Sequence, residues 1–317
     1  MLYIKPASYI LCMIEFYNED CFERFNKLKE NSVDAIITDP PYFIGFKGQT
    51  SKTEWDTGTD QEYYELLLRF FQECHRVLKA GGTLWMCFAR TKIKTVLNAL
   101  DNYDKSDDPN KLQCNLENWL TYARQKGRGA STKLKSQAEE IFHITKGKNY
   151  QWNTVEYLRE VVVPYITKDP ETGEPKPRGW FLDQNDGKRK RWVGTGNVLC
   201  FTSPFFKNRF EKQIHSTQKP FLLFTELIML STKPGELVFD PFAGSGSSGV
   251  AADCCGRNWI GCELDKEMYD KANEWVHNYD KELAEEYYKS RVRQAEGKPK
   301  KFSLNKKPKK FSLNKRT

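Results

Sequence analysis

The tetrapeptide Asp39-Pro40-Pro41-Tyr42 directly follows an apolar run, and it fixes the point at which the chain must leave a sheet. The run, residues 33–38, is rich in β-branched side chains and predicts a short buried strand. Two consecutive prolines cannot continue that strand, because each lacks a backbone N–H and has a fixed φ. A carboxylate, carbonyls without partners in the sheet and an aromatic ring therefore gather at the carboxyl end of a strand, where open α/β sheets bind ligands.

Hydrogen-bond acceptors beside a stacking ring suit a planar group that carries an amino substituent, such as adenine or cytosine. The alternative is an ordinary Asx-Pro turn that ends a strand, and the tetrapeptide alone fits both interpretations. Other segments of the chain are needed to decide between a base-binding corner and a simple turn.

A second strand end, far along the chain, carries a loop of small residues. Residues 236–240 predict a strand, residues 241–248 a loop, and the segment from Gly249 onward the start of a helix. Gly244, Gly246 and Gly249 satisfy the G-x-G-x-x-G pattern of nucleotide-binding loops. Glu263, after the next apolar stretch, lies near the offset expected of a ribose-binding acid. These features predict a nucleoside-type cofactor.

The charge around this loop distinguishes between cofactors. A dinucleotide would bring a pyrophosphate to the helix N-terminus, where a neighbouring acid would repel it. Asp240 ends the strand directly before the loop, and Asp39 is expected on the neighbouring strand end. S-adenosylmethionine carries a sulfonium and an ammonium and no phosphate, so this methyl donor fits an acid-lined site. A nicotinamide-dependent oxidoreductase is the alternative, and it leaves the Asp-Pro-Pro-Tyr element unexplained.

In their order along the chain, these motifs resemble the β-class DNA amino-methyltransferases, which methylate adenine N6 or cytosine N4. Residues 215–220 are similar to the family's His-Pro-Thr-Gln-Lys-Pro element beside the cofactor, and residues 18–21 resemble the Asp-Cys pair that contacts the cofactor's adenine. The resemblance covers about residues 12–147 and 213–275. Ser216 replaces the usual proline, and Ser248 stands where threonine is frequent.

This resemblance implies a doubly wound, mainly parallel, Rossmann-like α/β sheet with a circularly permuted motif order, and the alternation of predicted strands and helices agrees. It implies the catalytic residues Asp39, Pro40, Pro41 and Tyr42. The residues that it places at the cofactor, S-adenosylmethionine, are Asp20, Cys21, Asp39, His215, Ser216, Thr217, Gln218, Lys219, Asp240, Phe242, Ala243, Gly244, Ser245, Gly246, Ser247, Ser248, Glu263 and Leu264.

The implied reaction is a direct displacement on a base turned out of the duplex. Asp39 and the Pro40 carbonyl would accept the N–H groups of the amine, and Tyr42 would stack on the base. In this family an initial Asp favours adenine N6, and cytosine N4 is the alternative. RNA is a further alternative, because related Asp-Pro-Pro-Tyr enzymes act on it. Cytosine C5 methylation is disfavoured because the chain has no Pro-Cys dipeptide. A decayed, non-catalytic DNA-binding protein is the last alternative.

Four segments are predicted: a catalytic half (1–147), a target-recognition insertion (148–212), a cofactor-binding half (213–297) and a basic, disordered tail (298–317). The insertion interleaves basic and aromatic residues, which suits contact with DNA phosphates and bases. The alternative is an irregular insertion with a small core of its own. The candidate residues for binding double-stranded DNA are Arg124, Lys126, Arg128, Arg178, Lys188, Arg189, Lys190 and Arg191, and residues 47–60 are weaker candidates.

Several elements can be predicted along the chain. The apolar spacing predicts helices over 60–79, near 91–100 and over 220–231, and one charged helix over 266–294. Gly81-Gly82 is expected to end the first of these helices. Further strands are expected over 83–88, near 118–123 and near 140–145.

The composition predicts the cellular location of the protein and whether it binds a metal. No apolar stretch approaches membrane-spanning length, and the N-terminus lacks the layout of a signal peptide. Nine cysteines without a Cys-x-x-Cys pair predict reduced thiols and a cytoplasmic protein acting on DNA in a bacterial or phage-like context. Four histidines without metal-ligand spacing predict no metal site. A homodimer and a cognate restriction endonuclease are the partners considered besides DNA.

The net charge of +8 is concentrated in the tail, where a nine-residue segment is repeated. Residues 298–317 hold nine Lys or Arg and no acid, so the remaining chain is close to neutral. Such a segment suits a non-specific tether to phosphates. A duplicated solvating tail without a role is the alternative.

Deleting residues 298–317 should weaken binding to any DNA duplex without changing the methylated sequence, because phosphate contacts carry no sequence information. Filter binding at several salt concentrations and sequencing of the methylated sites measure the two effects. A changed sequence preference in the truncated chain would contradict the tether.

Overall fold

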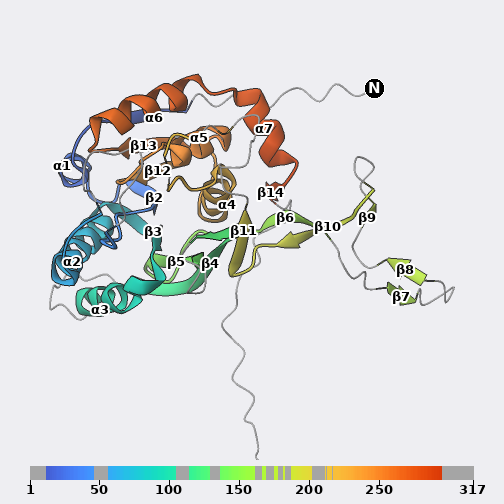
Figure 1. Ribbon diagram of the computed structural model, residues 1–317, viewed down its shortest axis with the longest axis horizontal. Coiled ribbons are helices and arrows are strands. Elements are labelled where there is room, and N and C mark those ends of the chain that lie inside the picture. Colours follow the sequence, from blue (N-terminus) through green and yellow to red (C-terminus); the bar gives the residue numbers. More distant parts are fainter. Residues whose placement is uncertain are drawn as a thin grey trace, which may run out of the picture.

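An eight-stranded sheet forms the centre of the structure, with helices on both faces (Figure 1). The computed structural model describes residues 12–45, 56–104, 114–128, 136–160, 166–168, 175–177, 181–182, 187–201, 211, 213–215 and 217–294. Within these ranges, no helix combines the length and the apolar character needed to cross a membrane.

The sheet is mixed and mainly parallel, in the order β1-β13-β12-β2-β3-β5-β4-β11. The strands β1, β13, β12, β2 and β3 pair in parallel, β5 is antiparallel to both β3 and β4, and β11 is parallel to β4. Their bounds are β1 (Ile14–Tyr17), β2 (Val33–Thr38), β3 (Leu78–Phe88), β4 (Cys114–Arg128), β5 (Ser136–Lys146), β11 (Val198–Phe201), β12 (Leu237–Asp240) and β13 (Asn258–Cys262).

Two hydrophobic cores, one on each face, hold the helices against the sheet. The first face is covered by α1 (Cys21–Lys27), α2 (Asp60–Val77) and α3 (Ile93–Asp104). The second is covered by α4 (Phe221–Ser231), α5 (Ser247–Cys254), α6 (Lys266–Asn278) and α7 (Lys281–Lys289). Alternation along β2 sends Ile36 to the first core and Ala35 and Ile37 to the second, as expected for a strand covered on both faces.

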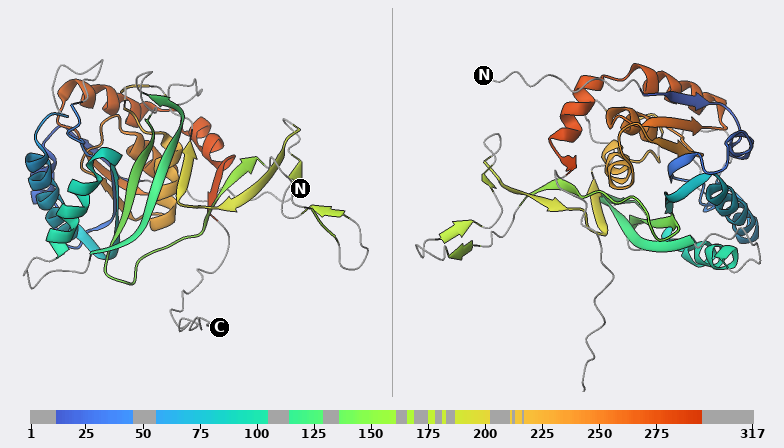
Figure 2. Two further views of the ribbon diagram at one scale, coloured as in Figure 1. Left: turned by 60° about the horizontal axis from the view of Figure 1, so that its bottom comes forward. Right: turned by 180° about the vertical axis from the view of Figure 1, so that it is seen from behind.

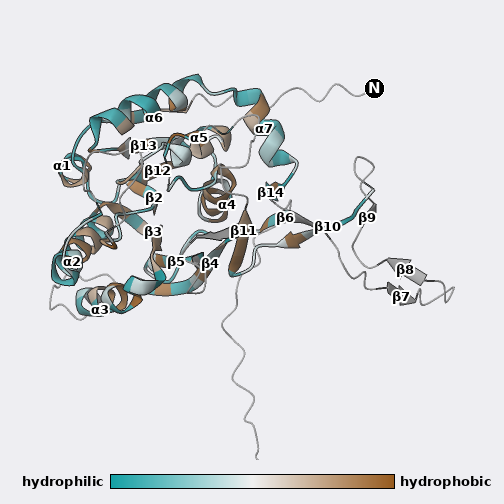
Figure 3. Ribbon diagram, in the orientation of Figure 1, coloured by the Kyte–Doolittle hydropathy of each residue, from teal (hydrophilic) through white to brown (hydrophobic). Residues whose placement is uncertain are grey.

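Helix α4 is apolar apart from Thr225, Glu226 and Ser231, and Figure 3 colours it mainly brown. Every residue of this helix is buried, because it contacts both the sheet and α5. A helix with apolar residues on all sides is expected in such a central place. It follows directly on Lys219 and Pro220, so its position determines where these two residues lie.

Parallel pairing places the predicted functional strand ends side by side. β12 lies between β13 and β2, with Val238 opposite Ala35 and Phe239 opposite Ile36. The carboxyl ends of β1, β13, β12 and β2 therefore share one edge of the sheet, and the residues that follow these strands lie near one another.

Two sequence predictions about helix ends are wrong. Gly81-Gly82 does not end α2, which stops at Val77; both glycines lie inside β3. Gly81 has a φ of +80°, and a Cβ there would lie 2.4 Å from the Asn149 carbonyl oxygen, so this position needs glycine for a close backbone approach.

The single charged helix predicted over 266–294 is divided into two helices and a strand. α6 ends at Asn278, and the Asp280 carboxylate accepts a hydrogen bond from the Leu283 backbone N–H at 3.0 Å, which caps α7. The chain then forms β14 (Val292–Gln294). A local capping residue has therefore outweighed the helical pattern of charges.

The segment predicted as an insertion forms small sheets of its own. β6 (Val155–Glu160), β9 (Phe181–Leu182) and β10 (Arg189–Gly194) form a four-stranded sheet with β14, and β7 (Ile166–Lys168) pairs with β8 (Pro175–Pro177). Both views in Figure 2 show these strands extending as an arm away from the main body. β11, which follows β10, returns to the main sheet, so the arm is attached there and through β14.

Replacing Gly246 by Ala should lower the free energy of unfolding by about 1–3 kcal/mol more than replacing Gly235 by Ala, because of overpacking. Both glycines have positive φ, but a Cβ at Gly246 would lie 2.4 Å from Val276 Cγ2, whereas no described atom lies within 4 Å of a Cβ at Gly235. Urea denaturation measures both variants. Equal losses would show that Gly246 is needed only for its φ.

Candidate active site

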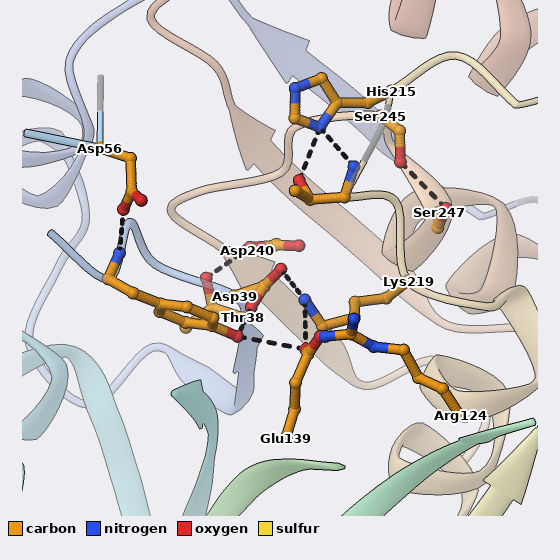
Figure 4. Close-up of polar contacts among 12 residues, drawn as sticks. Thr38, Asp39, Asp56, Arg124, Glu139, His215, Lys219, Asp240, Ser245 and Ser247 are labelled. Carbon is orange, nitrogen blue, oxygen red and sulfur yellow. Dashed lines mark hydrogen bonds and ion pairs between the residues drawn. The ribbon is translucent and has the colours of Figure 1, made fainter. Parts of the chain in front are cut away.

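A buried carboxylate, Asp240, joins the two predicted strand ends. Asp240 Oδ1 accepts a hydrogen bond from Thr38 Oγ1, at the end of β2, at 2.7 Å (Figure 4). Asp240 Oδ2 accepts one from Ser248 Oγ in α5 at 2.5 Å, and the Phe242 backbone N–H donates to Oδ1 at 3.1 Å. A single side chain therefore connects β2, β12 and the first turn of α5.

Burial dominates the electrostatics of this carboxylate. Although the three donors favour its ionised form, burial raises the pKa of Asp240 to about 7, and the charge of Asp39 acts in the same direction. The ionised form of this carboxyl group is therefore less favoured in the folded chain than in water.

The glycine loop between β12 and α5 is fastened to the end of β13. The Gly244 backbone N–H donates to Glu263 Oε2 at 3.1 Å, and the Asp265 N–H donates to Glu263 Oε1 at 2.8 Å. Burial raises the pKa of Glu263 above its ordinary value. Gly246 caps α5 at a φ of +76°, and Ser245 Oγ lies 3.1 Å from Ser247 Oγ. The predicted cofactor residues of this loop thus form one structural unit.

The predicted Asp-Cys pair lies at the same edge, after β1. Asn18 Nδ2 donates to the Glu263 and Leu264 carbonyl oxygens, at 2.8 and 3.1 Å. The Asp20 carboxylate accepts from the Phe22 N–H at 2.8 Å and caps α1. Cys21 is buried in the first core, and burial raises the pKa of its thiol to about 12. Leu264 is exposed beside them.

The loop after β2 is held by a second buried carboxylate, Asp56. It accepts hydrogen bonds from the backbone N–H groups of Tyr42 and Phe43, both at 2.7 Å, and of Ile44, at 3.3 Å. Phe43 has a φ of +54°, which is uncommon for a residue with a side chain. Asp56 therefore stabilises an unusual backbone conformation in the loop that follows the two prolines.

Asp39 lies at the centre of an ion-pair network (Figure 4). The Tyr42 hydroxyl donates to Asp39 Oδ1, and the Lys219 ammonium donates to Asp39 Oδ2. Lys219 Nζ also lies 2.8 Å from Glu139 Oε2, and Glu139 Oε1 pairs with the Arg124 guanidinium. Two carboxylates and two cations thus converge at the end of β2.

Tyr42 acts as a neutral donor in this network. Burial, followed by the negative charge of Asp39, raises the pKa of the Tyr42 hydroxyl well above its ordinary value. Its oxygen also lies 3.4 Å from Glu139 Oε2. The hydroxyl therefore keeps its proton at any physiological pH.

The predicted element at residues 215–220 forms a turn before α4. His215 Nδ1 accepts from the Thr217 N–H at 3.3 Å and lies 2.7 Å from Thr217 Oγ1. Gln218 Oε1 accepts from the Ile214 N–H at 2.8 Å. Burial lowers the pKa of His215, which favours the neutral imidazole. Ser216 lies outside the described residues.

The comparison with protein families distinguishes between the methyltransferase and the oxidoreductase interpretations of this site. Residues 33–274 match the family model of the N6/N4 DNA methylases, described as "DNA methylase". The chain belongs to this family.

Individual relatives agree with this assignment. The methylase is 27% identical over 256 residues to the type II methyltransferase M.HpaI of Haemophilus parainfluenzae, a match that covers 80% of this chain and 71% of the relative. The fold of this chain resembles that of the PvuII DNA methyltransferase (cytosine-N4-specific), with a TM-score of 0.57 and 16% identity. The match covers 88% of this chain and 93% of the other. The fold also resembles that of the M1.HpyAVI–SAM complex, with a TM-score of 0.52, 21% identity, and coverage of 84% and 100%.

Among the described residues of this methylase, those predicted to bind DNA lie in two places, the arm and β4. Arg189, Lys190 and Arg191 lie on β10 in the arm, and Lys188 precedes that strand. Arg124 pairs with Glu139 in the active-site network instead of lying with the basic residues of the arm. Lys126 and Arg128 follow it in β4, and Arg178 lies outside the described residues.

Two residues of the site, Glu139 and Asp56, are not among the catalytic or cofactor-binding residues that the sequence predicts. Glu139 lies near the start of β5, and β5 reaches the site because it runs antiparallel to β3. If β5 ran parallel to β3, its start would lie at the opposite edge of the sheet. A charged residue just before an apolar run was the available signal. The sequence predicts Asp56 only as part of a segment of weaker candidates for DNA contact.

Asp240 should make the stability of the methylase depend on pH. The folded chain keeps this proton up to about pH 7, whereas the unfolded chain releases it near pH 4, so the free energy of unfolding should fall as the pH rises between these values. Between pH 5 and pH 8 we expect the wild type to lose about 1–3 kcal/mol more stability than Asp240→Asn, which cannot titrate.

Urea denaturation at the two pH values measures this difference. Asp270→Asn, at an exposed position of α6, is the matched control and should follow the wild type. Parallel pH dependence of the wild type and Asp240→Asn would contradict the raised pKa.

Proposed function

We propose that this methylase transfers a methyl group from S-adenosylmethionine to the exocyclic N6 of adenine in DNA. The observation that carries the proposal is the hydrogen bond between Thr38 and Asp240, which joins the Asp39 corner to the glycine loop at one sheet edge. A base-binding corner and a cofactor loop must be neighbours for a one-carbon transfer. This proximity supports a single site with two ligands.

The residues at the strand ends suit S-adenosylmethionine. Asp240 and Glu263 bring carboxyl groups to the loop. A nearby cation favours their ionised form, so this loop suits a cationic ligand better than a pyrophosphate. Glu263 would hold the ribose hydroxyls, and the Gly244–Gly246 backbone would lie along the ligand. The M1.HpyAVI structure, with a similar fold, is a complex with SAM. When bound, the sulfonium supplies an activated methyl group.

Asp39 would act on the amine of the base. An exocyclic amino group is a poor nucleophile, because its lone pair is delocalised into the ring. Hydrogen bonds from its two N–H groups to the Asp39 carboxylate and the Pro40 carbonyl favour a pyramidal nitrogen with its lone pair directed at the methyl group. Positioning and electrostatics then supply most of the acceleration, without a covalent intermediate.

The base must leave the duplex before it can reach Asp39. Tyr42 would stack on the flipped base while its hydroxyl keeps its bond to Asp39. Asp56 holds the backbone of this loop, so the stacking ring is placed before the base arrives. Such preorganisation reduces the cost of binding.

Adenine N6 is proposed over cytosine N4 because Asp39 stands first in the tetrapeptide. Cytosine N4 is the second candidate, favoured by the similarity in fold to a cytosine-N4-specific enzyme.

The arm formed by β6 to β10 would contact the target duplex, with Arg189, Lys190 and Arg191 on phosphates. A homodimer and a cognate endonuclease are proposals of the same kind, drawn from the family resemblance.

Replacing Asp39 by Ala should lower the rate of methyl transfer at least about 100-fold, because a preorganised acceptor at the reacting nitrogen is lost. DNA affinity should be partly retained, since most of it comes from phosphate contacts. Tritium-labelled S-adenosylmethionine and unmethylated bacterial genomic DNA supply the assay. Mass spectrometry of the nucleosides separates N6-methyladenine from N4-methylcytosine.

The matched control is Asp270→Asn, which removes an exposed carboxylate from α6 and should keep the wild-type rate. Near-normal turnover by Asp39→Ala would overturn the role of Asp39. N4-methylcytosine as the product would replace adenine by the second candidate and leave the rest of the proposal in place.

A further inference from the structure

Asp39 is not free to receive a base as the structure stands. Oδ1 accepts the Tyr42 hydroxyl, and Oδ2 accepts the Lys219 ammonium. The amine of a base is a neutral donor, whereas the ammonium of Lys219 is charged, so Lys219 makes the stronger of the two bonds to this carboxylate. A base that reaches Asp39 must therefore compete with Lys219.

Displacing Lys219 would be costly if Asp39 were its single anionic partner. Its side chain is only 4% exposed, and a buried ammonium that loses its counter-ion is strongly destabilised. Glu139 removes this cost, because Glu139 Oε2 lies 2.8 Å from Lys219 Nζ at the same time. The ammonium thus has a second carboxylate within reach without moving through the protein.

Glu139 is itself held in place for this task. Its Oε1 pairs with the Arg124 guanidinium, and its side chain is only 10% exposed. Arg124 comes from β4, Glu139 from β5 and Lys219 from the turn before α4, so three separate elements meet here (Figure 4). The arrangement keeps the carboxylate aligned with the ammonium whether or not Asp39 is engaged elsewhere.

We propose that Glu139 is a positioning residue for methyl transfer: it retains the Lys219 ammonium when the amine of the base takes over Asp39 Oδ2. The inference rests on the proposed function, because it concerns the same reaction. The change of partner of Lys219 makes and breaks ion pairs and involves no covalent bond. In the enzyme without a bound base, Lys219 pairs with Asp39. In the complex with the base, Lys219 would pair with Glu139 alone, which keeps its ion pair with Arg124.

Glu140 offers a matched control on the same strand. Its side chain points to the other face of the sheet, where Oε1 accepts from Arg90 Nε and Oε2 from Trp119 Nε1, both at 2.7 Å. Glu140→Gln therefore removes a buried carboxylate next to Glu139 without touching the Asp39 network.

The test compares Glu139→Gln, Glu140→Gln, Lys219→Gln and the double variant Glu139→Gln/Lys219→Gln. Single-turnover transfer of labelled methyl to unmethylated genomic DNA gives the rate, and calorimetry gives the affinity for S-adenosylmethionine. We expect Glu139→Gln to lose about 10- to 100-fold in rate, because Lys219 then stays on Asp39, while its cofactor affinity stays within about twofold. Glu140→Gln should keep a near-normal rate.

The double variant separates a positioning role from a structural one. Since Glu139 acts through Lys219, its loss should matter little once Lys219 is gone, so the rate of the double variant should not fall below that of the slower single variant. Two losses that multiply would show independent roles and overturn the inference, as would a wild-type rate for Glu139→Gln.

Three further outcomes are informative. Should Glu139→Gln fail to fold, Glu139→Asp keeps the charge with a shorter reach, and a measurable loss of rate is expected; an unchanged rate would overturn the inference. Transfer by the wild type with an unimpaired Glu139→Gln variant would overturn this inference alone. Absence of transfer by the wild type and by Glu140→Gln would overturn the proposed function itself.

Discussion

The buried carboxylate of Asp240 is the constraint on which the site depends. It accepts hydrogen bonds from Thr38, from Ser248 and from the Phe242 backbone, and so joins two strands and a helix that are distant in sequence. Without such donors a buried carboxylate would be strongly disfavoured. The same contacts that satisfy Asp240 therefore place the Asp-Pro-Pro-Tyr corner beside the glycine loop. The hydrogen bonds that stabilise the buried Asp240 thus also assemble the active site.

Charge is distributed differently over the two halves of the site. Asp240 and Glu263 lie on the side of the glycine loop, where burial raises both pKa values. On the side of the base, Asp39 and Glu139 are matched by Lys219 and Arg124. An acidic cofactor side suits a sulfonium, and a balanced base side suits a neutral nucleobase. The proposed exchange of Lys219 between its two carboxylates preserves that balance when the base enters.

Much of the sheet edge could be predicted from the sequence, because its features are local. An apolar run that ends in two prolines, and a strand followed by glycines, each identify a strand end without knowledge of the rest of the fold. The structure confirms that β2 and β12 are neighbours, as the chemistry of the two motifs required. The roles of the individual residues in binding and catalysis stay predictions.

What could not be predicted depends on pairing between distant segments. The direction of β5 is set by its partners β3 and β4, and only that direction brings Glu139 to Asp39. From the sequence, Gly81 predicts the end of a helix. Its actual role, a close approach to the Asn149 backbone, depends on a segment distant in sequence. The most direct test of the account is a crystal structure with bound S-adenosylmethionine. We expect the sulfonium methyl to lie between the Gly244–Gly246 loop and the Asp39 carboxylate, whereas a methyl directed away from Asp39, or a cofactor bound at another edge, would contradict a single site.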